Sequence, residues 1–201
     1  RALKNPLDAW VYQEIICETR PDFIVEIGNK NGGSTLFLAH MCDLLGHGTV
    51  LALDIDHAAF GVTHPRIVTI TGDCSDESVL AQVHVKVAGR KVLVIHDADH
   101  SREAVLRDLR LYAPIVSSGS YFIVEDTIHG VSGFSISQDV RPGVFTVSNL
   151  NSPLSAVEAF LEGNREFVLD RDRERYILTS NYRGFLRRVR PVSAPPLRDA
   201  S

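Results

Sequence analysis

The sequence lacks the features that mark several classes of protein. Among its 201 residues only three are cysteines, Cys17, Cys42 and Cys74, and their spacing matches no metal site. We therefore expect neither a disulfide scaffold nor a zinc site, and a reducing cytoplasm is the expected location. No apolar run approaches the ~18–20 residues that a membrane span needs. The formal charge is −4, from 21 Lys and Arg against 25 Asp and Glu, so no basic surface for nucleic acid is expected.

The chain instead alternates short apolar strands with helices. The predicted helices are residues 6–20, 34–45, 75–87 and 101–112. The predicted strands, rich in Val, Ile and Leu, are residues 23–28, 49–54, 66–71, 91–95 and 119–124. Continuous apolar strands between helices are typical of a parallel sheet covered on both faces. The sequence therefore predicts an α/β, Rossmann-like, doubly wound fold with a mostly parallel sheet.

The C-terminal third is expected to add an antiparallel hairpin. Residues 154–161 have a helical pattern, and the strand-like segments Phe167–Leu169 and Arg175–Ser180 flank a charged run at 170–174. We interpret that run as a solvated turn between the two strands. Residues 185–201, with several arginines and three prolines, are expected to form an extended tail that could pack on a neighbouring subunit. The predicted organisation is one domain over residues 1–184, with an N-terminal helix at 6–20, followed by that tail.

A glycine-rich turn between the first strand and the next helix is the first candidate site. Such a turn lets a ligand approach backbone N–H groups at a helix N-terminus. It fits neither a dinucleotide fingerprint nor a phosphate loop, and it begins with an acid, Glu26, which suits a cationic, amino-acid-bearing cofactor. Asp54 ends the second strand, where an acid binds ribose hydroxyls. The pattern is typical of S-adenosylmethionine-dependent methyltransferases, and the alternative is an ordinary turn. The predicted cofactor-binding residues are Glu26, Gly28, Asn29, Ser34, Asp54 and Asp73.

Asp73 is the least specific of these residues. It follows the third strand, where this kind of fold usually contacts adenine. By itself it is equally consistent with a helix cap, because Asp is a preferred residue at that position.

Carboxylates after two neighbouring strands form the second candidate site. Asp97 and Asp99 follow the fourth predicted strand, and Glu125 and Asp126 follow the fifth. In a parallel sheet all four lie at the carboxyl edge, and without a cation their mutual repulsion would be costly. Ligation by oxygen alone, with open positions, suits Mg²⁺. The alternative is that Asp99 or Ser101 caps the next helix while the acidic pair faces solvent.

Four segments together resemble the cephalosporin hydroxylase family of bacterial antibiotic-pathway proteins: Asn5–Trp10, Glu26–Thr35, Asp97–Ser101 and Tyr121–Thr127. The resemblance covers residues 4–130. Despite the family's name it implies the class I methyltransferase fold, and the sequence lacks the His-x-Asp…His triad of a non-haem iron oxygenase. It implies S-adenosylmethionine and Mg²⁺ as cofactors and the hydroxyl of a 7-hydroxycephalosporin as the methyl acceptor. It also implies a partner, an iron- and 2-oxoglutarate-dependent hydroxylase, and a homo-oligomer such as a hexamer.

The resemblance also implies roles for the four acids. In similar magnesium-dependent O-methyltransferases, one Asp after the fourth strand and an acidic pair after the fifth hold the metal. That pair maps onto Glu125 and Asp126, and the first ligand is either Asp97 or Asp99. The aspartate that is not a ligand is then the candidate general base, which accepts the proton of the acceptor hydroxyl.

Other residues and other functions stay open. His96, His100 and His129 flank the acids and could act as bases, although a supporting role is commoner for such histidines. Residues 62–65 and 128–143 are candidates for a lid that excludes water. Two further functions compete with methyl transfer. One is a hydroxylase component that uses a nicotinamide cofactor, and the other is a non-catalytic subunit that presents substrate to a partner enzyme.

Overall fold

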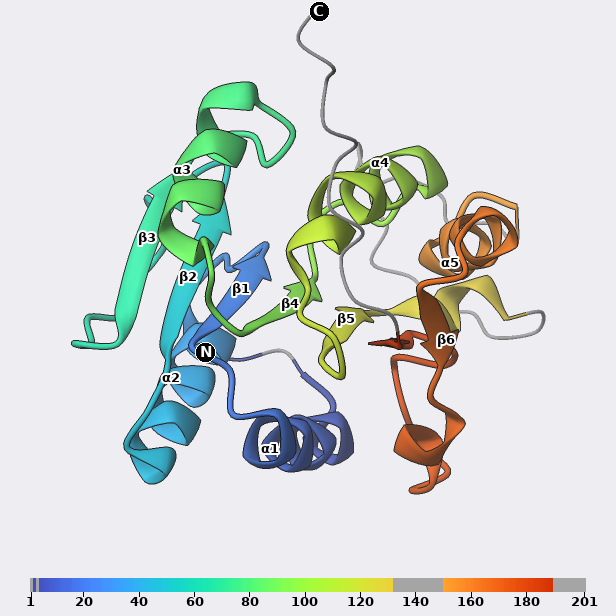
Figure 1. Ribbon diagram of the computed structural model, residues 1–201, viewed down its shortest axis with the longest axis horizontal. Helices are drawn as coiled ribbons and strands as arrows, with labels where there is room; N and C mark the ends of the chain where they lie inside the picture. The colour runs from blue at the N-terminus through green and yellow to red at the C-terminus, as the bar shows by residue number, and fades with distance from the viewer. Residues whose placement is uncertain (1, 3, 132–149, 190–201) are drawn as a thin grey trace, which may run out of the picture.

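A seven-stranded sheet forms the centre of the molecule (Figure 1). The computed structural model describes residues 2, 4–131 and 150–189. Within them the strand order is β3-β2-β1-β4-β5-β7-β6. The strands are β1 (Phe23–Ile27), β2 (Thr49–Asp54), β3 (Ile67–Thr71), β4 (Val92–His96), β5 (Tyr121–Val124), β6 (Phe167–Leu169) and β7 (Phe185–Arg188). The first five are parallel, and β7 pairs antiparallel with both β5 and β6. The predicted α/β fold with antiparallel strands at its C-terminal side is confirmed.

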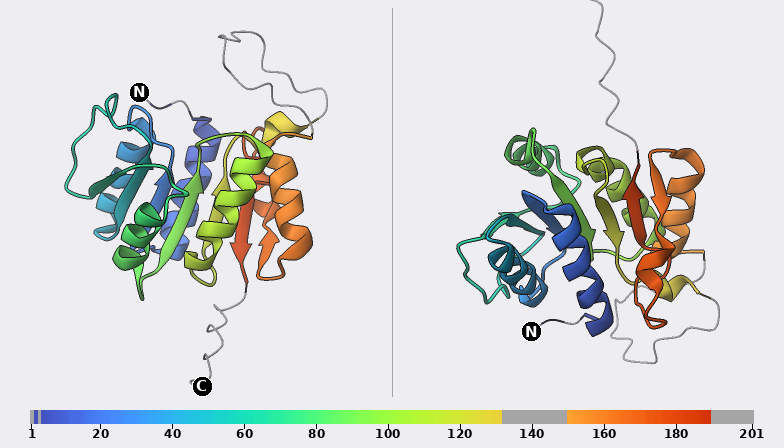
Figure 2. Two further views of the ribbon diagram at one scale, coloured as in Figure 1. Left: turned by 90° about the horizontal axis from the view of Figure 1, so that it is seen from above. Right: turned by 60° about the horizontal axis from the view of Figure 1, so that its bottom comes forward.

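Helices cover both faces of this sheet (Figures 1 and 2). They are α1 (Pro6–Thr19), α2 (Gly33–Leu45), α3 (Glu77–Val87), α4 (Arg102–Tyr112) and α5 (Pro153–Gly163). Successive strand residues point to opposite faces, so Val25 and Ile27 pack with α3, α4 and α5, whereas Ile24 packs with α1 and α2. The molecule therefore has three layers and two apolar cores. None of the described helices is both long and apolar enough to cross a membrane.

The strand register brings the candidate sites to one edge of the sheet. Ile27 at the end of β1 pairs with Leu53 on one side and with His96 on the other, and His96 pairs with Val124 of β5. The segments that follow β1, β2, β4 and β5 therefore leave the sheet side by side. Chain order reverses between β1 and β4, and ligands of open α/β sheets bind at such a switch point.

The predicted hairpin and tail need correction. Phe167 of β6 pairs with Arg188 of β7, whereas residues 175–180, the predicted partner strand, form no strand. Residues 185–188, assigned to the tail, belong to the sheet, so the domain extends beyond residue 184. The arginines of this segment favoured a solvated tail in the sequence analysis. In the structure the Arg188 guanidinium is buried, and it donates to the carbonyls of Ala113, Pro114 and Val116. Residues 190–201 of the predicted tail lie outside the described residues.

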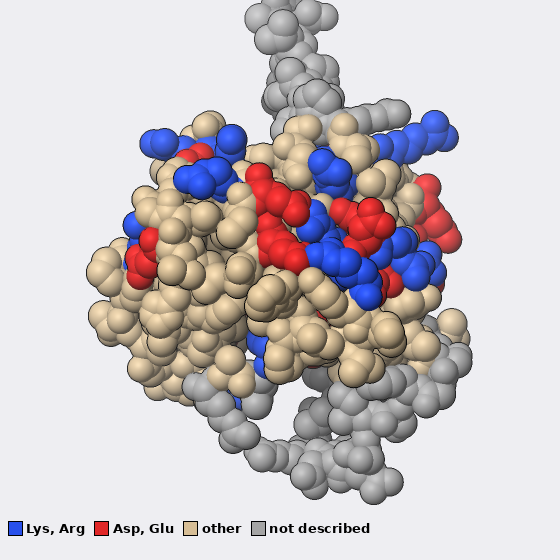
Figure 3. Space-filling view, turned by 90° about the horizontal axis from the view of Figure 1, so that it is seen from below, with Lys and Arg blue, Asp and Glu red and all other residues tan. Residues whose placement is uncertain are grey.

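The charged run at 170–174 is only partly the solvated turn that was predicted, because Arg171 and Asp172 are exposed but Arg173 is not. It contains a short 3-10 helix, η3 (Arg171–Glu174), that is held against α1. The Arg173 guanidinium pairs with Glu18 of α1 and also donates to the Tyr121 hydroxyl, so its side chain is only 10% exposed. Acidic and basic side chains accordingly lie next to one another on the face that carries α1 (Figure 3). This network fixes the segment that continues to residue 184.

Candidate active site

A cavity of about 630 Å³ lies at the carboxyl edge of the parallel strands. Its wall includes five of the six predicted cofactor-binding residues and three of the four predicted metal or catalytic acids, and Lys4 and His100 are among its cationic side chains. These are Gly28, Asn29, Ser34, Asp54, Asp73, Asp97, Asp99, Asp126, Lys4 and His100. Of the predicted site residues, Glu26 and Glu125 lie behind this wall. The two sites derived separately from the sequence thus share one cavity.

The glycine turn after β1 is fixed by backbone geometry and by one carboxylate. Gly28 has φ +86°, and a Cβ there would lie 2.1 Å from the Asp97 carbonyl oxygen, so only glycine fits. Asp54 Oδ2 accepts the backbone N–H groups of Asn29 at 2.7 Å and Lys30 at 2.8 Å. Burial alone would raise the pKa of Asp54, but these N–H donors hold it below its ordinary value. Asp54 therefore orders the turn as well as facing the cavity.

Glu26 lies beneath the turn. Its carboxylate is fully buried, and Oε2 accepts the Thr35 hydroxyl at 2.5 Å and the Asn29 side-chain amide at 2.9 Å. Burial raises the pKa of Glu26, and the charge of Lys4 opposes that shift. Among the described residues its Oε1 has no hydrogen-bond partner. Glu26 therefore stabilises the turn and keeps one free acceptor oxygen, and its predicted role as a cofactor contact stays a prediction.

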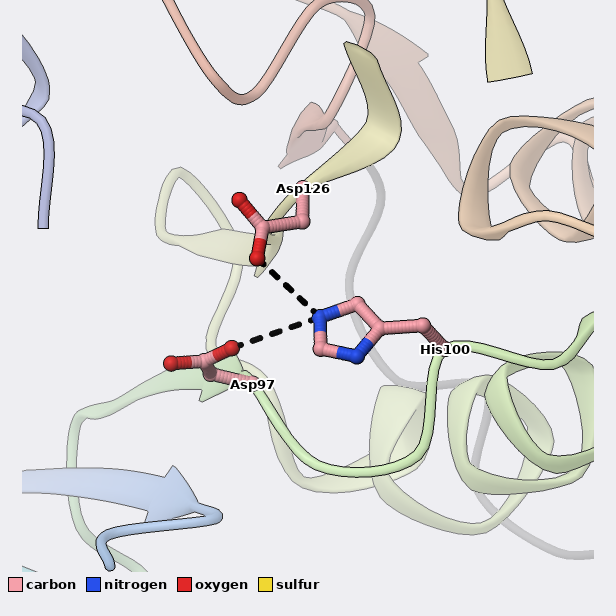
Figure 4. Close-up of side chains that lie close together, drawn as sticks. All are labelled: Asp97, His100 and Asp126. Carbon is pink, nitrogen blue, oxygen red and sulfur yellow. Dashed lines mark ion pairs between the residues drawn. The ribbon is translucent and has the colours of Figure 1, made fainter. Parts of the chain in front are cut away.

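Two acids and a histidine converge where β4 and β5 end (Figure 4). His100 Nε2 lies 3.5 Å from Asp97 Oδ1 and 3.2 Å from Asp126 Oδ2. One potential ligand atom from each of the three residues fits within 4.8 Å of the others. Burial alone would lower the pKa of His100, but Asp126 and Asp97 raise it to about 10. The three side chains form a compact site that is already charge-paired.

A lysine from the N-terminal segment completes this cluster. Lys4 Nζ contacts Asp97 Oδ2 and lies 2.6 Å from Glu125 Oε2. Burial raises the pKa of Glu125 to about 8, an effect that the charge of Asp97 adds to and that of Lys4 reduces. Burial would likewise raise the pKa of Asp97, but His100 and Lys4 hold it below its ordinary value. Sequence reasoning missed Lys4, although it directly precedes the Asn5–Trp10 segment that carried part of the family resemblance.

The remaining candidates stand apart from the cluster. Asp99 Oδ1 accepts the backbone N–H of Ser101 at 2.6 Å, and the Ser101 hydroxyl caps α4. This matches the capping alternative for that stretch. His96 is buried and lies 3.0 Å from Asp108 beneath the cavity. His129 Nε2 is 3.9 Å from Asp126, at the margin of the site.

A second layer of polar groups supports the acidic pair from behind. Asp126 has φ +56°, and its backbone N–H donates to Asn181 Oδ1 at 3.1 Å. The Asn181 amide donates in turn to the Tyr12 hydroxyl at 2.7 Å. Burial raises the pKa of Tyr12 well above its ordinary value, and the neighbouring Glu125 adds to that shift. Asn181 lies in an irregular segment far from the acids in sequence, and no local pattern predicted it.

Comparison with known proteins identifies the family. A family model described as Rhamnosyl O-methyltransferase/CmcI matches residues 1–189. The chain belongs to this family. It is 30% identical over 191 residues to Rhamnosyl O-methyltransferase of Mycobacterium tuberculosis, covering 91% of this chain and 74% of the relative. It is also 30% identical over 175 residues to the Mycobacterium leprae protein of the same name, covering 85% and 70%. The family resemblance and the enzyme class predicted from the sequence, an O-methyltransferase, are confirmed.

Solved structures support the fold of this family member. A structure of CmcI with Mg and SAM superposes with a TM-score of 0.69 at 24% identity, covering 94% of this chain and 74% of that one. A structure of MycE with Mg, SAH and Mycinamycin VI gives 0.53 at 20% identity, covering 78% and 39%. These likenesses confirm the class I methyltransferase type of sheet.

The cavity of this Rhamnosyl O-methyltransferase/CmcI family member fits the two predicted cofactors. The ordered turn suits a ligand that carries an amino group, because the unpartnered Oε1 of Glu26 lies beneath it, and Asp54 adds a carboxylate on the wall. For a divalent cation, three carboxylates meet at the ends of β4 and β5, and Glu125 Oε1 has no hydrogen-bond partner within the described parts of the chain. Hard oxygen donors of this kind are those that Mg²⁺ prefers.

Proposed function

We propose that this protein transfers the methyl group of S-adenosylmethionine to a hydroxyl of a small secondary metabolite in a Mg²⁺-dependent reaction. One observation carries the proposal. The glycine turn with its Asp54 support and the acids Asp97 and Asp126 line the same cavity, so a methyl donor and a metal-bound acceptor would meet there. Family membership supports the reaction class.

The cofactor would lie along the switch point of the sheet. Gly28 and Asn29 offer an approach to the turn, Asp54 is placed for the ribose hydroxyls, and Asp73 lies farther along the cavity, where the adenine would lie. Asp73 also accepts the backbone N–H and hydroxyl of Ser75, so it orders its own loop as the capping alternative expected.

Asp97, Glu125 and Asp126 would hold the metal. Bound Mg²⁺ supplies a Lewis acid that lowers the pKa of the acceptor hydroxyl and fixes its oxygen beside the methyl group. The three acids come from two adjacent strand ends, so the sheet itself sets their spacing. Asp99 is not proposed as a ligand, because its side chain is engaged with the N–H of Ser101.

Two groups remain as candidates for the general base, Asp99 and His100. His100 is the better placed, because its imidazole points into the acid cluster where the acceptor hydroxyl would be activated (Figure 4). Without metal the neighbouring acids keep His100 protonated, but Mg²⁺ held by the same acids would lower its pKa, and we then assign it the proton of that hydroxyl. Replacement of His100 by Ala should therefore lower kcat far more than replacement of Asp99 by Asn.

The acceptor is best sought among sugars. The relatives at 30% identity are named for a rhamnosyl acceptor, and a sugar hydroxyl satisfies the same chemistry as the hydroxyl of a 7-hydroxycephalosporin. We therefore propose a deoxysugar hydroxyl first and the cephalosporin second. A hydroxylase partner and a homo-oligomer stay predictions.

The first test is calorimetric titration with S-adenosylmethionine, with and without Mg²⁺, using NADH and 2-oxoglutarate as controls. We expect micromolar binding of S-adenosylmethionine, about −8 kcal/mol. Binding of NADH alone would refute the proposal and favour the nicotinamide-dependent alternative.

The second test separates catalysis from substrate presentation. Glu125→Gln should abolish methyl transfer to rhamnosylated and cephalosporin acceptors while S-adenosylmethionine binding persists. Glu162→Gln, an exposed position on α5, is the matched control. Unchanged methyl transfer in the Glu125 variant would refute the role of Glu125 as a metal ligand, and no methyl transfer by the wild-type protein would favour the non-catalytic subunit.

A further inference from the structure

The Lys4 ammonium lies among the groups proposed as metal ligands. Asp97 divides its two carboxylate oxygens between different cations, with Oδ1 facing His100 and Oδ2 contacting Lys4. The second partner of Lys4 is Glu125 Oε2. The Lys4 side chain is 12% exposed, and it forms part of the cavity wall. Lys4 and His100 thus contact the acid cluster through different oxygens.

The local charges explain why a lysine is held there. Asp97, Glu125 and Asp126 bring together three carboxylates, of which Glu125 is buried and the other two are partly exposed, and an uncompensated charge in such a place is costly. Lys4 and His100 are the cationic side chains that contact them within the described residues. Lys4 therefore supplies a compensating charge that a divalent cation would supply instead.

We propose that the Lys4 ammonium occupies the carboxylate site in the metal-free protein and leaves it when Mg²⁺ binds. The inference rests on the metal site of the proposed function. Lys4 contacts Asp97 and Glu125, two of the carboxylates that would hold the metal, and two positive charges at one position would repel each other. The affinity of the site for Mg²⁺ is then set by competition with a residue of the same chain.

Asn5, the residue after Lys4, is anchored to α1, so Lys4 can be displaced without unfolding that helix. Asn5 Oδ1 accepts the backbone N–H of Leu7, and the Asn5 carbonyl accepts that of Ala9, so α1 is capped directly after Lys4. Movement of Lys4 therefore needs only its own side chain and the residues before it. α1, which carries Tyr12 of the second layer, keeps its place.

Mg²⁺ titration of charge variants tests the competition. In Lys4→Met the aliphatic stem remains and the charge is removed, and Lys86→Met, on the exposed face of α3, is the matched control. If Lys4 is displaced in no more than about a tenth of metal-free molecules, its removal should tighten Mg²⁺ binding at least about tenfold. Without metal, Lys4→Met should melt at a lower temperature than wild type, and Mg²⁺ should raise its melting temperature by more.

Amine labelling of the wild-type protein gives an independent readout. In the metal-free protein, Lys4 should react slowly with an acylating reagent, as measured by mass spectrometry. Saturating Mg²⁺ should increase its labelling severalfold, while the exposed Lys86 should be unaffected. This measurement still tests the inference if Lys4→Met does not fold, and Lys4→Gln offers a second variant.

The outcomes separate the two proposals. Equal or weaker Mg²⁺ binding in Lys4→Met, or Lys4 labelling that Mg²⁺ does not change, overturns the displacement and leaves the metal site in place. If neither the wild type nor the variant binds Mg²⁺ while both bind S-adenosylmethionine, the metal site is overturned, and the displacement is overturned with it.

Discussion

Asn181 is expected to stabilise the acidic pair, although it is far from it in sequence. It is buried, and its side chain makes two hydrogen bonds, one from the Asp126 backbone N–H and one to the Tyr12 hydroxyl. Asn181→Ala removes both bonds and leaves the N–H of Asp126 buried without its acceptor. Each such loss costs about 1–3 kcal/mol, so we expect a total of about 3 kcal/mol. For a chain of this length that corresponds to a melting temperature about 6–12 °C lower.

Loss of the Asn181 side chain should also affect one of the two proposed ligands of the site and not the other. Asp126 has a left-handed backbone, which costs a residue other than glycine about 1–2 kcal/mol and has to be held by its surroundings. Without Asn181 the Asp126 carboxylate loses its fixed direction. Asn181→Ala is therefore expected to weaken Mg²⁺ binding but not S-adenosylmethionine binding. Asn181→Asp keeps the acceptor oxygen and should retain part of the Mg²⁺ affinity.

Urea unfolding measures the change in the free energy of unfolding. It can be followed by circular dichroism and by the fluorescence of Trp10, the single tryptophan. Asn164→Ala is the control, because Asn164 makes one side-chain bond, to the Glu166 N–H, in a partly exposed position. The control should lose less than about 1 kcal/mol. If Asn181→Ala loses no more than this control, or loses S-adenosylmethionine and Mg²⁺ binding together, the reasoning is refuted.

Two further changes test the electrostatics and the backbone of the site. His100 has a pKa of about 10 against an ordinary 6.5, so its contribution to metal-free stability is complete below about pH 6.5 and is lost as the pH rises through 10. His100→Gln should therefore flatten the decline in stability between pH 7 and 10 in thermal melts with EDTA, and an unchanged slope would contradict this. Gly28→Ala should cost more than about 3 kcal/mol and abolish S-adenosylmethionine binding, because its Cβ would overlap a carbonyl oxygen. Gly46→Ala, also at positive φ but in open space, should cost only about 1 kcal/mol.

The parallel part of the fold was predictable because its signals are local. β1, β2, β4 and β5 are short apolar runs, and each is nearly or fully buried. Once the strands were known to be parallel, their carboxyl ends had to meet, and that placed Asp97 and Glu125 together before any coordinate was known.

The C-terminal part was not predictable, because its signals are long-range. Residues 175–180 are rich in apolar side chains, yet Ile177 is 91% exposed. β7, in contrast, carries two arginines, which favoured a tail. Arg188 is tolerated in the sheet because three carbonyl oxygens after α4 and the Glu166 carboxylate meet its guanidinium. Only the tertiary structure brings those acceptors together.

The sequence predicts the acid cluster correctly, and the structure shows which side chain compensates its charge. Clustered carboxylates need a positive charge, and the sequence pattern predicts a metal ion as its source. The protein itself provides a charge through Lys4, 93 residues away from Asp97 along the chain. An uncompensated buried charge costs several kcal/mol, a large fraction of the stability of a domain, so the acids need a partner before any metal arrives. We therefore expect this edge to fold without a metal ion, and under the displacement proposal Mg²⁺ would compete with Lys4 for the carboxylates.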